Sequence, residues 1–97
     1  MVIAGEPLEF AEVKERIRKI LSGAGSVTPS QHALDQLRAR DMTMVDVVNV
    51  LRGGYVESAE EIAGTWRYRV CTPRMVVIVA FRAETELRIV TGWRISR

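Results

Sequence analysis

The chain has 97 residues, enough for one domain with a modest hydrophobic core and too few for two. Apolar residues make up 47% and charged residues of both signs 27%, a composition that excludes an intrinsically disordered chain. One cysteine and one histidine exclude an internal disulfide and an ordinary zinc site, so we expect no metal and no other cofactor.

The sequence lacks targeting signals of the common kinds. Its start, MVIAGEPLEF, has no basic segment of the type that begins a signal peptide. It also has no run of about 18 consecutive apolar residues, the length that a membrane-spanning helix needs. We therefore expect a cytoplasmic protein that does not contact a membrane.

The net charge of +2 hides an uneven distribution. Residues 1–60 carry seven basic and nine acidic side chains, a charge of −2, whereas residues 61–97 carry seven arginines against three glutamates, a charge of +4. Arginine binds phosphate through two parallel hydrogen bonds, so the second half could face a nucleic acid. An ordinary solubilising surface would have the same composition.

Three helices are expected before residue 55. Apolar residues recur at steps of three and four over residues 7–22, and the segment SGAGS then ends this helix in a loop. Thr28 as N-cap, with Pro29 and Gln31 behind it, predicts the start of a second helix. Thr43 as N-cap with Asp46 predicts a third, which the glycines at 53–54 end.

After the glycines the apolar period changes from about 3.6 to 2. Residues 55–56 could form a short strand, residues 65–70 and 87–95 alternate, and residues 75–81 are apolar throughout. Short connections join the later strands, which favours antiparallel pairing. We therefore expect an α+β fold, with the N-terminal helices packed on one face of an antiparallel sheet of three to four strands.

The second helix carries the only histidine of the chain. His32, Gln36 and Arg40 follow one another at steps of four, so they form one ridge that runs from solvent toward the edge of the packed face. Histidine changes its protonation state near neutral pH and could act as a general base. An exposed histidine without a further role is the alternative.

Several short motifs occur together in a recognisable order. They are His32-Ala33, Arg40, Met42-Thr43, the stretch 47–51 with its following glycine, and the strand segments 66–70, 75–81 and 90–91. In this order they resemble domain-of-unknown-function family 4258, a bacterial family grouped with the RelE and ParE-like toxins of the barnase-EndoU-colicin-RelE type. The resemblance covers residues 28–94. It implies a single domain, 1–97, with a RelE-like core at 27–97 and an extra N-terminal helix and loop at 1–26.

The resemblance implies a ribonuclease toxin that needs no metal, cleaves RNA through the ribose 2′-hydroxyl and is held by an antitoxin or another protein partner. It implies catalytic roles for His32 as base or acid, Arg40 as phosphate clamp and Tyr68 as proton donor. The implied substrate-binding residues are Gln36, Arg67, Arg69, Thr91 and Arg94. Tyr68 could equally belong to the core, and alternation along its strand places it opposite Arg69, so the two cannot both line one cleft.

Two positions depart from the family pattern. Gln36 stands where the family usually has a second arginine, and Asp41 stands where it has a glycine. Loss of one charged donor typically lowers the rate of such chemistry by about 10²–10³. Two further functions therefore stay open: a non-catalytic RelE-like module that binds a protein or a nucleic acid, and an accessory protein that regulates another factor.

Overall fold

The computed structural model describes residues 5–95 and has an α+β fold, as expected. Its elements are α1 (Phe10–Lys19), a π-helical turn η1 (Ile20–Ala24), β1 (Ser26–Pro29), α2 (Gln31–Ala39), α3 (Met44–Gly53), β2 (Tyr55–Ile62), β3 (Thr65–Cys71), β4 (Met75–Ala83) and β5 (Glu86–Arg94). Within the described residues, no helix has the length and apolar character needed to cross a lipid bilayer.

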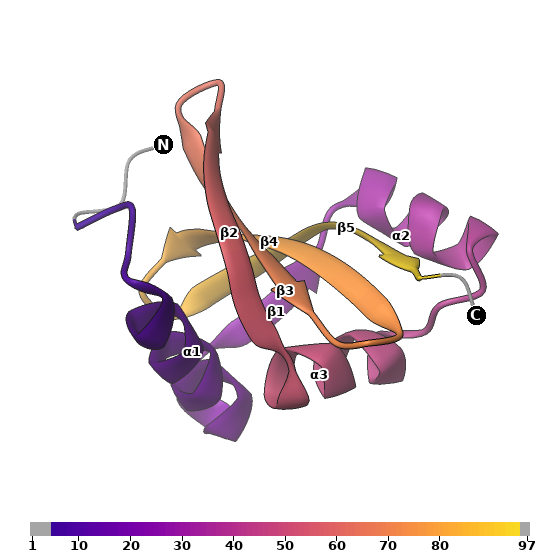
Figure 1. Cartoon of the computed structure of the whole chain (residues 1–97), viewed down its shortest axis with the longest axis horizontal. Helices are drawn as coiled ribbons and strands as arrows, with labels where there is room; N and C mark the ends of the chain where they lie inside the picture. Colours follow the sequence, from indigo (N-terminus) through magenta and orange to yellow (C-terminus); the bar gives the residue numbers. More distant parts are fainter. Residues whose placement is uncertain (1–4, 96–97) are drawn as a thin grey trace.

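The sheet has five strands in the order β1-β5-β4-β3-β2, and Figure 1 shows the long β2–β3 hairpin projecting from it. Strands β2 to β5 form the antiparallel meander that the sequence predicts. The expected number of strands and the purely antiparallel sheet are wrong, because β1 pairs in parallel with β5. With four residues, one of them proline, β1 has too little alternation to be recognised without its partner.

The second helix starts later than predicted. Its N-cap is Ser30, whose hydroxyl accepts a hydrogen bond from the Ala33 amide at 3.0 Å, while Thr28 and Pro29 lie in β1. The capping box of α3 is confirmed: the Asp46 amide donates to the Thr43 hydroxyl at 3.2 Å, and the Thr43 amide donates to the Asp46 carboxylate at 2.9 Å.

The main core lies between the helices and one face of the sheet. Each helix contributes fully or nearly fully buried apolar side chains, and alternate residues of β3, β4 and β5 face them: Tyr68, Val70, Val77, Val79, Phe81, Leu87 and Ile89. Helix α1 buries Val13 and Ile17 in this same core. The described part of the predicted N-terminal extension is therefore an integral part of the domain.

The opposite face of the sheet has a different character. Cys71, Val76 and Ala80 are buried there but do not join the main core cluster. Alternation along β3 places Arg67 and Arg69 on this face, and both are half-buried. The sheet thus has one apolar face under the helices and one face that carries arginines, which we call the arginine face.

Candidate functional site

Gln36 and Arg40, two residues of the predicted ridge on α2, form hydrogen bonds with β5. The Thr91 hydroxyl donates to the side-chain oxygen of Gln36 and accepts from Arg40 Nη1 at 3.2 Å. The same Nη1 donates to the Gly92 carbonyl at 2.8 Å. Thr91, Gln36 and Arg40 therefore lie together, and they fix the position of α2 along β5.

His32 lies at the edge of a hollow of about 440 Å³ on the arginine face. It is the second residue of α2, which follows β1 directly, and β1 is paired with β5. This connection brings the imidazole beside side chains from β3, β4 and β5. The hollow is lined by Ser30, His32, Thr65, Arg67, Ala80, Phe81, Arg82, Arg88 and Val90, and we call it the arginine hollow.

The arginine hollow has a strongly positive lining. Arg67, Arg82 and Arg88 line it, and no carboxylate does. The Nε atoms of Arg67 and Arg88 are buried and have no hydrogen-bond partner among residues 5–95, so the hydrogen-bonding capacity of these two N–H groups is unused. Arg82 has a partner, Glu86, but at 3.9 Å this exposed ion pair is weak.

A second, smaller hollow of about 240 Å³ continues along the same face, and Arg67 lines both. Ile78, Thr91 and Trp93 lie in its wall. Arg69 also lines it, but its guanidinium packs over the Trp93 ring at 5.0 Å from the ring centroid, and its Nε lies 2.9 Å from Glu57. Arg69 therefore lies on the expected face with its charge already balanced.

Tyr68 does not belong to this surface. It is fully buried on the core face, where its hydroxyl donates to Glu6 at 2.7 Å and accepts from the Leu8 amide at 3.1 Å. Burial raises the pKa of Tyr68 to about 12, and the hydrogen bond to Glu6 adds to the effect. The proposed catalytic role of Tyr68 is thus wrong in the state described, because no solvent or substrate reaches it.

Arg94 also lies away from the arginine hollow. Its Nη2 donates to the Asp41 carbonyl at 2.7 Å and lies 3.6 Å from the Asp46 carboxylate, so it holds the connection between α2 and α3. Asp41 has a left-handed backbone with a φ of 57°. This conformation favours glycine and tolerates aspartate.

Two arginines of the hollow, Arg82 and Arg88, are not among the site residues that the sequence predicts. For Arg88 a signal existed: Leu87 and Ile89 alternate with it, and a strand that buries those two must turn Arg88 to the arginine face. For Arg82 no such signal existed, because the preceding residues 75–81 are all apolar and do not distinguish the faces.

The described residues contain no group of three or more histidine, cysteine, aspartate or glutamate side chains arranged to hold a metal ion. No protein-family model matches the chain, no curated protein matches it, and no solved structure matches it.

Proposed function

We propose that the arginine face binds RNA and that His32 cleaves the bound strand without a metal ion, in the manner of a RelE-like ribonuclease toxin in the cytoplasm. One observation carries the proposal: the only histidine of the chain and three arginines line the same hollow. The planar guanidinium of arginine can bind a phosphate group through two parallel hydrogen bonds. A histidine beside a bound phosphate can accept a proton from the attacking hydroxyl or donate one to the leaving oxygen.

The chemistry requires few groups. The His32 imidazole accepts the proton of the ribose 2′-hydroxyl, and the 2′-oxygen forms a bond to the adjacent phosphorus. Arg67 and Arg88 stabilise the charge that develops on the phosphate oxygens. The P–O5′ bond breaks with its electron pair, and the 5′-oxygen takes a proton from water. The hydroxide that remains takes the imidazolium proton, and the products are a 2′,3′-cyclic phosphate and a 5′-hydroxyl.

A second candidate function is binding without cleavage, and the α2 ridge favours it. Gln36 and Arg40 both form hydrogen bonds with Thr91. In this arrangement their side chains hold α2 against β5 and are not available for catalysis. The lining of the arginine hollow holds no further imidazole or carboxyl that could serve as a general acid. A face of this kind can hold RNA or an acidic partner without turnover.

The first experiment measures binding and cleavage separately. A fluorescent single-stranded RNA is titrated with the protein in EDTA, with anisotropy for binding and a denaturing gel for cleavage. We expect Arg88→Ala to weaken binding about tenfold or more, which corresponds to one lost charged hydrogen bond. His32→Ala should leave the Kd within about twofold but slow cleavage by about 10²–10⁴. Arg74→Ala, a control at an exposed turn outside the hollow, should change neither.

The outcomes separate the two functions. Binding that Arg88→Ala weakens, with no cyclic-phosphate product from the unmodified protein, identifies a binding module. Equal loss of affinity in Arg74→Ala and Arg88→Ala would contradict the site itself. Induced expression in a bacterial host then tests the toxin proposal, which requires growth arrest with RNA cleavage and relief of both by His32→Ala at matched protein levels.

A further inference from the structure

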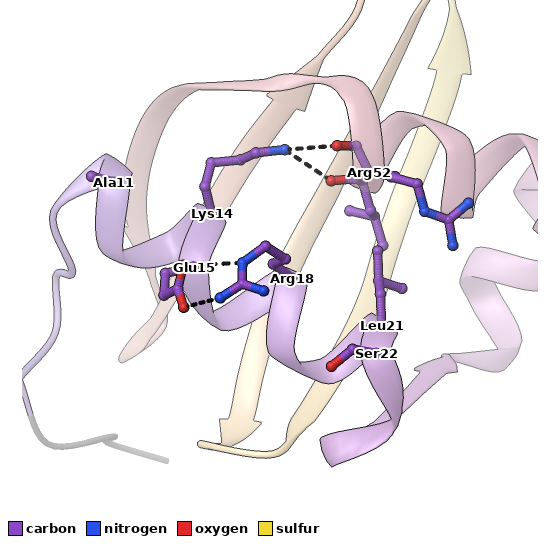
Figure 2. A pocket seen from close by; sticks show the side chains of 8 residues that line it. Ala11, Lys14, Glu15, Arg18, Leu21, Ser22 and Arg52 are labelled. Carbon is purple, nitrogen blue, oxygen red and sulfur yellow. Dashed lines mark hydrogen bonds and ion pairs between the residues drawn. The ribbon is translucent and has the colours of Figure 1, made fainter.

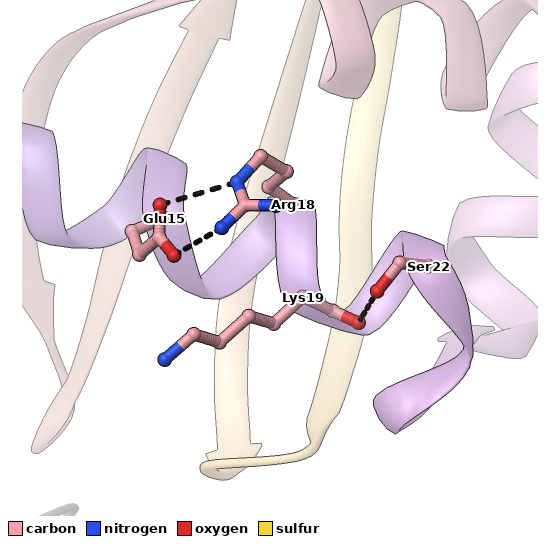
Figure 3. A network of polar contacts seen from close by, with 4 residues as sticks. All are labelled: Glu15, Arg18, Lys19 and Ser22. Carbon is pink, nitrogen blue, oxygen red and sulfur yellow. Dashed lines mark hydrogen bonds and ion pairs between the residues drawn. The ribbon is translucent and has the colours of Figure 1, made fainter.

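The hollow between α1 and α3, of about 570 Å³, has charged side chains that are mostly bound within the chain. Lys14 Nζ donates to the carbonyls of Leu51 and Arg52 at 3.0 and 3.4 Å, and the Arg52 guanidinium points away from the other lining charges (Figure 2). Arg18 donates two hydrogen bonds to Glu15 (Figure 3). The smaller hollow beside the arginine hollow differs from it, because one of its charged groups is unused.

This smaller hollow, of about 240 Å³, combines apolar walls with a carboxylate. Ile62, Ile78 and Trp93 supply the apolar surface, and each of these side chains is partly accessible. Glu60 also lines it and is exposed, and within residues 5–95 its carboxylate makes no hydrogen bond or ion pair. An ionised carboxylate has two oxygens that can accept hydrogen bonds, so this group can recognise a donor. We call this cavity the Glu60 hollow.

The register of the β2–β3 hairpin brings Glu60 to the arginine face. Glu60 pairs with Arg67, and Ser58 pairs with Arg69, in the hairpin that projects from the sheet in Figure 1. Residues paired across two strands turn their side chains to the same face, so Glu60 and Ser58 stand beside the two arginines. Arg67 lines both hollows, and a molecule that occupies both must therefore pass it.

The character of the arginine face changes at Arg67. The arginine hollow has three arginines and no carboxylate, which suits a phosphate. In the Glu60 hollow, Arg69 is already paired with Glu57 and stacked on Trp93, and the Glu60 carboxylate would repel a second phosphate. An uncharged flat ring with hydrogen-bond donors on its edge suits these walls better. In a nucleic acid, such a ring lies next to every phosphate.

We propose that the Glu60 hollow binds an unpaired guanine next to the phosphate held by the arginine hollow. The inference rests on the proposed RNA function and adds a choice of sequence to it. Guanine presents N1–H and an N2 amino group side by side, and the two oxygens of the Glu60 carboxylate can accept from both. The ring packs against Trp93 and Ile78, as unpaired bases do on aromatic and apolar side chains.

The other bases match a carboxylate less well. Uracil presents one N–H between two carbonyl oxygens, which the carboxylate repels. Adenine and cytosine present one amino group beside a ring nitrogen that is itself an acceptor. Because Glu60 would bind the edge that forms base pairs, a guanine within a duplex cannot enter. The Glu60 hollow therefore selects single-stranded RNA with guanine beside the bound phosphate.

The test uses a short fluorescent oligouridylate with a 2′-O-methyl group on every ribose, so that binding is measured without cleavage. One central uracil is kept, or is replaced by guanine or by hypoxanthine, which keeps N1–H but lacks the N2 amino group. Anisotropy gives the three Kd values. We expect guanine to bind about tenfold or more tighter than uracil, as for a bidentate contact to a base, with hypoxanthine between them.

Two matched variants assign the preference to one side chain. Glu60→Gln should reduce the preference for guanine over uracil to about twofold or less, because an amide offers one acceptor in place of two. Glu61→Gln removes the same charge from the next residue, which pairs with Trp66 and lines neither hollow of the arginine face. It should keep the full preference. A general effect of the lost charge on RNA affinity cancels in the ratio of the two Kd values.

Equal affinity for the three oligonucleotides, with Arg88→Ala still weakening all of them, would overturn the guanine subsite and leave the RNA site intact. A preference that survives Glu60→Gln, or that Glu61→Gln lowers as much, would overturn it as well. So would an RNA duplex that binds with the same preference. If no oligonucleotide binds, the proposed RNA function and the subsite both fail, so the two kinds of failure are distinguishable.

Discussion

Tyr68 illustrates how one hydroxyl can be read as a catalyst or as part of the core. The sequence places it beside arginines, in a strand that the family resemblance links to RNA chemistry. In the fold, the hydroxyl joins β3 to the segment before α1 through Glu6 and Leu8. Its role at the residue scale is to satisfy buried polar groups at the N-terminal end of the domain.

We predict that Tyr68→Phe destabilises the protein and leaves RNA binding and cleavage unchanged. The free energy of unfolding should fall by about 1–2 kcal/mol at neutral pH, because the Leu8 amide and the Glu6 carboxyl lose their partner. The measurement is urea denaturation followed by tryptophan fluorescence. A variant that keeps full stability but loses cleavage would contradict this account and restore a catalytic role to the hydroxyl.

The difference in unfolding free energy between the unmodified protein and Tyr68→Phe should also depend on pH. The pKa of Tyr68 is raised to about 12 in the folded protein, above its ordinary value of 10.0, so the folded state favours the neutral phenol. The stabilisation is therefore fully present below pH 10 and is lost as the pH rises from about 10 toward 12, since the unfolded chain ionises first. The difference between the two unfolding free energies should shrink over this range.

At the scale of the element, the start of α2 decides where β1 ends and where His32 points. We predict that Ser30→Ala lowers the free energy of unfolding by about 1 kcal/mol, because the Ala33 amide loses its acceptor. Thr28→Ala should cost less than about 0.5 kcal/mol, since this exposed residue lies in β1 and caps nothing. Both values come from urea denaturation. The reverse order would mean that the helix begins at Thr28, as its sequence suggests.

The elements also show what the sequence could reveal. Helices with an apolar stripe and strands β3 and β5 were predictable because one face of each is buried, which imposes a period on the residues. Strand β4 was predictable from its continuous apolar run, since it is buried on both faces. Strand β2 was recognised only at Tyr55 and Val56, since its remaining six residues are mostly exposed on both faces and carry no period. The ridge on α2 was predictable from spacing, but its contact with Thr91 depends on a pairing across 55 residues. The RelE-like assignment stays a prediction.

At the scale of the molecule, the charge asymmetry of the sequence becomes a difference between two faces. Of the seven arginines after residue 60, Arg67, Arg69, Arg82 and Arg88 line the two hollows of the arginine face, and Arg97 lies outside the described residues. Strand alternation thus places four of the seven arginines on one face of the sheet.

We predict that RNA binding depends steeply on salt. If Arg67, Arg82 and Arg88 each neutralise one phosphate of a single strand, log Kd should rise with log salt concentration with a slope of about 2. Arg88→Ala should reduce this slope by about 0.7, whereas Arg74→Ala should leave it unchanged. Anisotropy titrations at several salt concentrations give the slopes. A slope near zero in the unmodified protein would mean that the hollow does not hold phosphates.

The parallel pairing of β1 with β5 has a consequence for how the protein is made. Ser26 lies beside Glu86, a separation of 60 residues, and the helix that carries His32 rests on that same last strand. During synthesis, β1 and α2 emerge well before β5 and have nothing to pair with until it appears. Closing so long a loop is slow and belongs to the late stage of folding. We expect helix α3 and the β2–β4 meander to form first and the arginine hollow to be assembled last. The site that carries His32 and the arginines would then exist only at the end of folding.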